Sequence, residues 1–432
     1  MPSSPRGAEI APPTHLASLP GELRVERFDN GLTAALFVNR QAPLVTSALY
    51  LKAGTRDEPA AHGGVAHFLE HMMFKGGARY GPGEIDRLTQ ALGGANNAFT
   101  NHDATTYYFN FAADRWVQAL EIEVDRMSAL ALDPQAVASE RQVILEELAM
   151  YESEPWDALE VAVHARLFAG HAYGHPVLGN RETLAATDAA ALRDFHRRFY
   201  RPDNAVLVVA GDIDPDAALA AVEGTLGALP AGAETRAPSR PAEAVPRTLE
   251  RLERRKGEVA RLMLALPGPP GAHPDHPALR LAVILLGGSR MSRLQRALVD
   301  EEKLCAWLTA DLSEGLDASF LTIAAEVVPD VEPARVEERV LRLLDELFSE
   351  PPNEEEMERA HRIAQADWVF DHEKVHQQAL SLGAALALFD LDHLDLYMRT
   401  MAGTGRGRLL AVADRYLRPA RGSVLGWSLP KP

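Results

Sequence analysis

The residues best suited to chemistry are two histidines and a glutamate in the segment HGGVAHFLEHMMFKGG, residues 62–77. On a helix, which advances about 100° per residue, His71 lies about 40° from His67 and one turn above it. Glu70 lies about 60° to the other side of His67. Two imidazoles on one helical face can share a metal ion, and a carboxylate then stands beside the ion's open position.

This H-x-x-E-H pattern is close to a mirror image of the common zinc motif H-E-x-x-H, and it is itself a zinc signature. The alternative is an exposed helix in which a histidine and a glutamate form an ion pair. Apolar residues surround the three polar ones, however: Val65, Ala66, Phe68, Leu69, Met72, Met73 and Phe74. Charges on a largely buried helix need pairing or a metal, so the sequence favours a metal site.

A catalytic zinc ion usually has three protein ligands and one open position. Residues 139–150 (SERQVILEELAM) have a helical pattern in which Glu140 and Glu147, seven residues apart, share one face. Glu146 points about 100° away from Glu147 and is the less suitable of the two neighbours. An isolated acidic helix is ordinarily a solvated surface, so this segment alone does not identify the third ligand.

The elements that would position these side chains follow from hydrophobic periodicity. Asn30-Gly31 predicts a hairpin between strands 23–28 and 32–38. Further strands are predicted at 42–52, 97–100, 105–112 and 204–211, and helices at 65–74, 85–92, 115–130, 134–151 and 215–226. Beyond residue 248 the predicted strands are 260–266, 319–327 and 423–428, and the helices are 277–286, 333–348 and 353–368.

The order of strand, helix, glycine stop, strand and long helices thus occurs twice, which indicates a duplicated module. Large apolar residues are almost absent from the proline-containing segment 230–248, which is typical of a linker. The predicted organisation is a polar tail at 1–20, a module at 21–229 that bears the metal site, the linker, and a second module at 249–432 without one.

Composition restricts the class of protein. The chain has 432 residues with 44 basic and 61 acidic side chains, and a net charge of −17 argues against a nucleic-acid partner. A single cysteine, Cys305, excludes an internal disulfide and a thiolate metal cluster. No stretch approaches the roughly 20 apolar residues of a membrane span, and no signal peptide is evident. We expect a cytoplasmic protein, or a periplasmic one if a leader was removed.

In this pattern of residues the chain resembles the pitrilysin and mitochondrial processing peptidase family of inverted-motif zinc peptidases. In that family a third ligand glutamate follows the second histidine by about 76 residues, which is Glu147 here, and Glu140 matches an additional acidic residue. The resemblance spans about residues 20–430 and includes the segments GGANNAFT (93–100), Thr106-Tyr107, YGHPVLG (173–179) and RPDNA (201–205). It implies an α+β fold of two similar modules, each a mostly antiparallel sheet with helices packed on one face.

The resemblance also implies a mechanism with one zinc ion per chain, held by His67, His71 and Glu147. The ion would lower the pKa of its bound water to about 7, and Glu70 would be the general base that takes the proton. Glu140 would orient a ligand histidine. An edge strand would bind extended peptide substrate through Asn97, Ala98, Phe99 and Thr100. The alternative for Asn97 is a simple turn residue.

The second half has no H-x-x-E-H motif, since the corresponding helix reads ALRLAVILL at 278–286. The family commonly carries an arginine and a tyrosine there, which bind substrate opposite the zinc, but this chain has Val299 and Ala306 instead. We therefore expect a homologous partner subunit that supplies the Arg/Tyr pair, so that this chain is the catalytic subunit of a heterodimer.

Two alternatives to a zinc peptidase remain. A non-catalytic structural subunit of the same fold would not need the complete motif, and a metal-storage protein would not need Glu70. The remaining histidines singled out, which lack a spacing that fits the site, are expected to be structural or surface residues: His62, His102, His164 and His171.

Overall fold

The computed structural model describes residues 8–10, 21–232 and 246–431. Contacts divide the chain into two compact units, and each unit is assembled from three separate stretches. The first contains the described parts of Met1–Glu147, Val177–Pro238 and Val369–Asp395. The second contains Leu148–Pro176 and the described parts of Ser239–Trp368 and Leu396–Pro432. Most of the predicted tail and residues 233–245 of the predicted linker lie outside the described residues.

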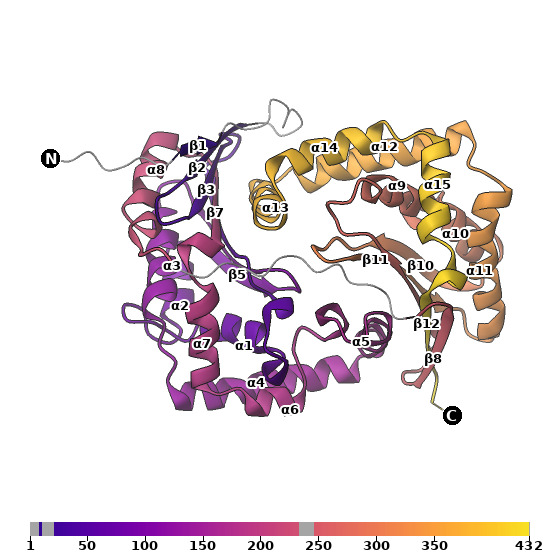
Figure 1. The fold of residues 1–432 in the computed structure, drawn as a ribbon, viewed down its shortest axis with the longest axis horizontal. Coiled ribbons are helices and arrows are strands. Elements are labelled where there is room, and N and C mark those ends of the chain that lie inside the picture. The colour runs from indigo at the N-terminus through magenta and orange to yellow at the C-terminus, as the bar shows by residue number, and fades with distance from the viewer. Residues whose placement is uncertain (1–7, 11–20, 233–245, 432) are drawn as a thin grey trace. The chain divides into compact units, whose positions relative to one another are not determined.

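The first unit contains a sheet with the order β1-β2-β3-β7-β4-β6-β5 (Figure 1). All neighbours in it are antiparallel except β3 and β7. The predicted hairpin is confirmed as β2 and β3, and β5 forms one edge. The strands are β1 Ala8–Ile10, β2 Glu22–Arg27, β3 Thr33–Val38, β4 Leu44–Leu51, β5 Ala95–Thr100, β6 Thr105–Ala112 and β7 Ala205–Gly211.

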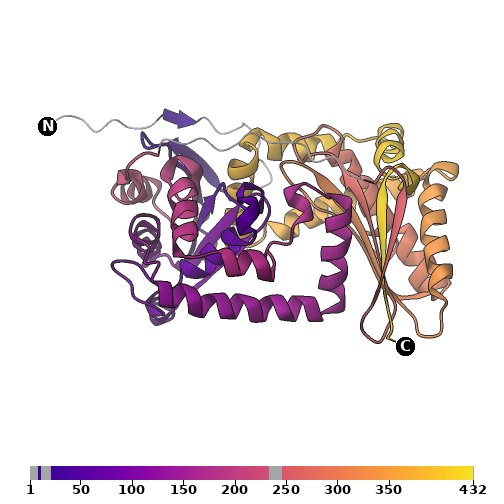
Figure 2. The ribbon, with the colours of Figure 1, turned by 60° about the horizontal axis from the view of Figure 1, so that its bottom comes forward.

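Helices cover both faces of the first sheet. On β7, Val206 and Val208 face a core cluster that includes α13, whereas Leu207 and Val209 alternate to the opposite face and are equally buried. The helices that lie mainly in this unit are α1 Val65–Met72, α2 Glu84–Ala91, α3 Val117–Ala129, α4 Pro134–Ser153, α6 Arg181–Ala186, α7 Ala189–Phe199, α8 Pro215–Glu223 and α13 Val375–Leu388. Figure 2 shows that α4 is one continuous helix.

The helix α13 comes from the second half of the sequence but packs on the first sheet. The hydroxyl of Tyr50 donates a hydrogen bond to the carbonyl oxygen of Leu380 over 2.8 Å, and the amide of Asn39 donates to Gln378 Oε1 over 3.0 Å. Gly383 lies against the Tyr50 ring, where an added Cβ would stand 2.2 Å from a ring carbon. Only glycine allows this close approach.

The second unit contains a sheet with the order β10-β11-β9-β12-β8, antiparallel except for the parallel pair β12 and β8. Its strands are β8 Leu249–Arg255, β9 Arg261–Gly268, β10 Cys305–Leu312, β11 Ser319–Val327 and β12 Ser423–Leu429. The helices with residues in this unit, besides the end of α4, are α5 Pro155–Leu167, α9 His276–Gly287, α10 Arg293–Gln295, α11 Pro333–Ser349, α12 Glu354–Asp371, α14 Leu391–Ala402 and α15 Arg406–Tyr416.

The two sheets share one topology. The series β3-β7-β4-β6-β5 of the first matches β8-β12-β9-β11-β10 of the second, in chain order and in the direction of every pairing. This repeat agrees with the predicted two-module α+β fold. Each sheet also receives a helix from the other half of the sequence: α5 packs on β9 and β12, and α13 packs on β4 and β7. The module boundaries 21–229 and 249–432 stay a prediction.

Among the described residues, no helix combines the length and hydrophobicity that crossing a membrane would require.

Candidate metal centre

Helices α1 and α4 bring His67, His71 and Glu147 together in the first unit. One ligand atom from each residue lies within 4.8 Å of the other two. The Nε2 atoms of His67 and His71 are 3.9 Å and 3.5 Å, respectively, from Oε2 of Glu147. The two imidazole rings meet edge to face with their centroids 4.7 Å apart. Two imidazoles and one carboxylate this close together match the donor set that catalytic zinc sites use.

The local environment favours metal binding by these groups. His67 is 8% exposed, and burial, with the neighbouring His71 as a second cause, lowers its pKa to about 4. This imidazole is therefore neutral near pH 7, the form that binds metals. A hydrogen bond with His71 lowers the pKa of Glu147, although burial opposes the effect, so Glu147 carries negative charge. The residues present thus fit a divalent cation.

Glu140 lies behind His71 on the same face of α4 as Glu147. Its Oε1 accepts a hydrogen bond from His71 Nδ1 over 2.9 Å, and its Oε2 is 2.5 Å from the ammonium group of Lys75. A carboxylate on Nδ1 holds the imidazole so that Nε2 points at Glu147. The sequence does not single out Lys75, which lies in the turn after the end of α1 at Met72.

Glu70 lies beside the three clustered residues and is not one of them. Its carboxylate accepts a hydrogen bond from the hydroxyl of Thr100, on β5, over 2.5 Å. Burial raises the pKa of Glu70, and the bond from Thr100 opposes this rise. The substrate-binding role of Thr100 stays a prediction, and in the structure its hydroxyl contacts the expected general base, Glu70.

The strand β5 pairs with β6 and forms the edge of the described sheet. Asn97 lies within this strand, so the alternative interpretation as a turn residue is wrong. Its side-chain oxygen accepts a hydrogen bond from the backbone N–H of Ala98 over 2.9 Å. Phe99 is on the other face from Thr100, with its ring edge-on to Tyr50 at 6.5 Å. In the described sheet β5 has β6 as its one neighbouring strand, and the side chain of Asn97 is exposed.

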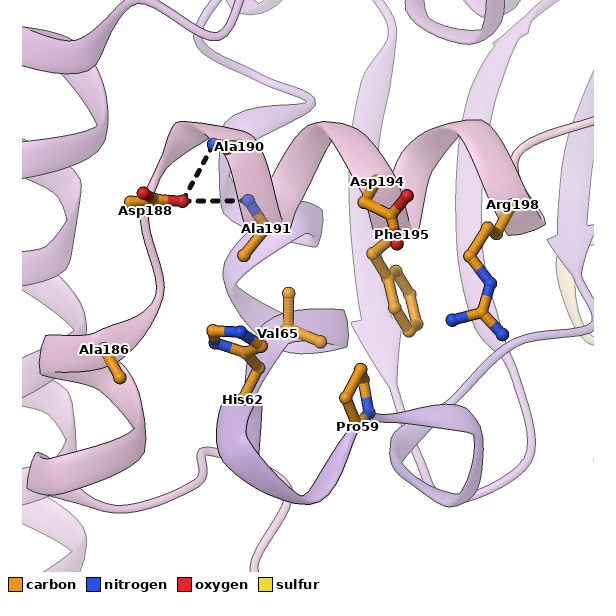
Figure 3. A pocket seen from close by; sticks show the side chains of 10 residues that line it. All are labelled: Pro59, His62, Val65, Ala186, Asp188, Ala190, Ala191, Asp194, Phe195 and Arg198. Atoms are coloured by element: carbon orange, nitrogen blue, oxygen red, sulfur yellow. Dashed lines mark hydrogen bonds between the residues drawn. The ribbon is translucent and has the colours of Figure 1, made fainter.

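None of the four further histidines singled out in the sequence belongs to the cluster of candidate ligands found among the described residues. His102 Nδ1 lies 2.6 Å from the Thr55 hydroxyl, and the His164 ring packs on Phe320. His171 accepts a hydrogen bond from the backbone N–H of Tyr173. His62 lines a separate pocket of about 400 Å³ beside the start of α1, which contains none of the candidate ligands (Figure 3).

The two positions at which the family resemblance implies an arginine and a tyrosine, Val299 and Ala306, lie in the second unit. Val299 is in a π-helical turn, Arg296–Glu301, and packs against the apolar core. Ala306 occupies an irregularity of β10, where the register with β11 shifts between Cys305 and Trp307. Neither side chain can donate a hydrogen bond.

Comparison with known proteins identifies the family and supports the fold. The family described as insulinase (peptidase family M16) matches residues 34–181, and the peptidase M16 inactive domain matches residues 187–363. The protein "Uncharacterized zinc protease YmxG" of Bacillus subtilis is 31% identical over 295 residues, 68% of this chain and 71% of the relative. Mitochondrial-processing peptidase subunit beta of Blastocladiella emersonii is 30% identical over 277 residues, 63% of this chain and 59% of the relative.

Solved structures show the same fold. A protease from Helicobacter pylori has a TM-score of 0.89 at 22% identity, covering 95% of this chain and 100% of its own. Pitrilysin has a TM-score of 0.79 at 18% identity, and the match covers 99% of this chain but 47% of the pitrilysin chain. The chain therefore belongs to peptidase family M16 and has the two-module α+β fold of its structural relatives.

Proposed function

We propose that this protein is a zinc-dependent endopeptidase or oligopeptidase. The observation that carries the proposal is the convergence of His67, His71 and Glu147, whose ligand atoms lie within 4.8 Å of one another. When bound there, a zinc ion supplies a Lewis acid that polarises a peptide carbonyl and lowers the pKa of a water molecule. The names of the relatives as zinc proteases support the choice of metal.

Residues of the chain itself transfer the proton, orient the reacting groups and bind the substrate. Glu70 accepts a proton from the attacking water and later delivers it to the leaving amine. Thr100 orients the Glu70 carboxylate through its hydroxyl, and Glu140 orients His71. An extended substrate adds a strand to the edge of β5, where Asn97 and Ala98 provide main-chain partners.

Removal of the metal tests this proposal. The purified chain is expected to contain one zinc ion, and a chelator should remove it and abolish hydrolysis in the assembled enzyme. The far-ultraviolet circular dichroism should stay unchanged, because the hydrophobic clusters of both units consist of apolar side chains that do not depend on the site. Added zinc should restore activity. Unfolding on zinc removal, or hydrolysis that survives it, would contradict the proposal.

We also propose that this chain is the zinc-bearing half of a heterodimer. Its match covers about half of the pitrilysin chain, and a relative is named as the beta subunit of a processing peptidase. Because Val299 and Ala306 cannot donate hydrogen bonds, a homodimer would lack the donors that such a partner brings. The proposed location is the cytoplasm.

Adding a homologous chain that carries the arginine and tyrosine but lacks H-x-x-E-H should raise hydrolysis by about 10²–10³-fold, the typical value of such transition-state donors. The measurement is the rate of peptide cleavage by the chain alone and in mixtures with each co-encoded paralogue. Replacing that arginine and tyrosine in the partner should cancel the increase. A homogeneous preparation whose rate no paralogue raises would rule out the heterodimer.

A further inference from the structure

We propose that Glu58 and Arg126 are positioning residues that fix the two ends of α1, the helix that carries both histidines and Glu70. We call these two residues the helix clamp. The inference rests on the proposed function, because it concerns the placement of the groups that hold zinc.

The helix α1 is short, with eight residues from Val65 to Met72, and an isolated helix of this length is not stable in water. Its N-cap residue is Gly64, which has no side chain to satisfy the first N–H groups. Glu58, from the preceding loop, takes over this role. Its Oε2 accepts a hydrogen bond from Gly64 N over 2.8 Å, and its Oε1 accepts one from Ala66 N over 2.9 Å.

At the other end, Arg126 of α3 contacts the backbone just after α1. Its Nε donates a hydrogen bond to the carbonyl oxygen of Met73 over 3.1 Å, and its Nη1 donates to Glu123 Oε1 over 3.0 Å. The guanidinium also lies over the rings of Phe74 and Tyr107, at 4.5 Å and 5.1 Å from their centroids. Arg126 therefore fixes the last turn of α1 to a different helix.

The burial of the ion pair between Arg126 and Glu123 argues against a role in stability alone. The side chains of Arg126 and Glu123 are 2% and 1% exposed, and Arg126 Nη2 and Glu123 Oε2 have no hydrogen-bond partner within the described structure. Burial of an ion pair costs free energy because both charges lose their hydration, and atoms without hydrogen-bond partners do not recover this cost. Apolar residues of similar volume commonly stabilise a protein as well as such a pair, or better. What apolar residues cannot supply is the directed bond to the Met73 carbonyl.

The clamp thus fixes α1 both along its axis and in rotation. His67, Glu70 and His71 lie between the two fixed ends, whereas Glu147 lies on α4. A small shift of α1 would change both histidine-to-Glu147 distances together and move Glu70 relative to Thr100. Displacements of about 1 Å in such sites can cost about 10²-fold in rate.

Two variants test the clamp from opposite ends. Glu58→Gln keeps the size of the side chain but leaves one acceptor oxygen where two N–H groups donate. The double variant Glu123→Leu with Arg126→Met removes both charges, so that no single buried charge is left unpaired. The matched control is Glu84→Leu with Arg87→Met, the same residue types at the same spacing on α2, where the side chains are 44% and 75% exposed.

The measurements are the thermal unfolding midpoint, zinc affinity by competition with a chelator, the visible spectrum of the cobalt(II)-substituted protein, and kcat and KM of the assembled enzyme. We expect both clamp variants to unfold near the wild-type temperature and to bind zinc about 10- to 100-fold more weakly. Their cobalt spectra should change, and kcat should fall about 10-fold or more while KM changes little. The control should match the wild type in all four.

Wild-type zinc affinity and an unchanged cobalt spectrum in the clamp variants would overturn the inference, whatever their thermal midpoints. If the double variant fails to fold, Glu58→Gln decides the question by the same measurements. Failure of the wild-type chain to bind zinc would instead overturn the proposed function itself, so the two failures are distinguishable.

Discussion

Glu70→Gln is expected to reduce peptide hydrolysis by about 10²–10⁴-fold, the usual contribution of a general acid–base group. The amide has nearly the size of the carboxylate but cannot take a proton from water. Thr100 can still donate its hydrogen bond to the amide oxygen, so the side chain should keep its orientation. Folding and zinc content should stay unchanged, because the cluster of candidate ligands consists of His67, His71 and Glu147.

A matched control is Glu146→Gln, which alters an exposed carboxylate directly beside Glu147 and should leave the rate unchanged. Activity is measured in the assembled enzyme, with zinc content and circular dichroism recorded on the same preparations. Unchanged hydrolysis by the Glu70→Gln protein would refute the role of Glu70. A wild-type chain that binds zinc but cleaves no peptide with any partner would favour the non-catalytic subunit of the same fold.

Truncation after residue 232 is expected to abolish folding of the first unit, even though the fragment contains all its strands and the whole candidate metal centre. The fragment lacks α13, which covers one face of the sheet. Its loss would expose five large buried side chains: Val25, Phe37, Tyr50, Val206 and Val208. At about 1.5–3 kcal/mol each, their burial is worth roughly 8–15 kcal/mol. That equals the whole stability of a typical domain, about 5–15 kcal/mol.

The fragment should show no cooperative unfolding transition and should bind a dye specific for exposed apolar surface. A peptide of residues 369–395, which contains α13, should restore cooperative unfolding when added in trans. In the full-length chain, Leu382→Glu on the buried side of α13 should strongly lower the unfolding temperature. Leu396→Glu is the control, because Leu396 is 60% exposed. A stable, cooperative fragment without α13 would show that this helix is dispensable.

The elements near the metal centre could be predicted because their signals are local. Glycine stops bound the apolar helix α1, and Asn30-Gly31 marks the first hairpin. The ligand spacing was meaningful because His67 and His71 are one helical turn apart. The contact between α1 and α4 could be predicted only from the family resemblance, because no local pattern in the sequence places Glu147 next to a helix whose His71 lies 76 residues earlier.

Other features depend on contacts that a single sequence does not reveal. Gly383 lies in the middle of α13, although glycine has a low helix propensity. The structure explains this glycine by its close contact with the ring of Tyr50, which is more than 300 residues earlier in the sequence. The strand β8 reads LERLERR, a charged pattern that is compatible with an edge position but is not typical of a strand. The contact of Thr100 with Glu70 depends on which face of β5 meets α1, and that follows from the strand register.

The packing of α13 on the first sheet also affects folding during protein synthesis, because the strands of the sheet are made long before the helix. The ribosome completes the last strand of the first sheet, β7, at Gly211, but α13 ends only at Leu388. At about 5–20 residues per second, the nascent chain needs roughly 10–35 s to make the intervening 180 or so residues. Throughout this interval the face of the sheet that α13 covers lacks that helix, and exposed apolar surface of this kind favours aggregation.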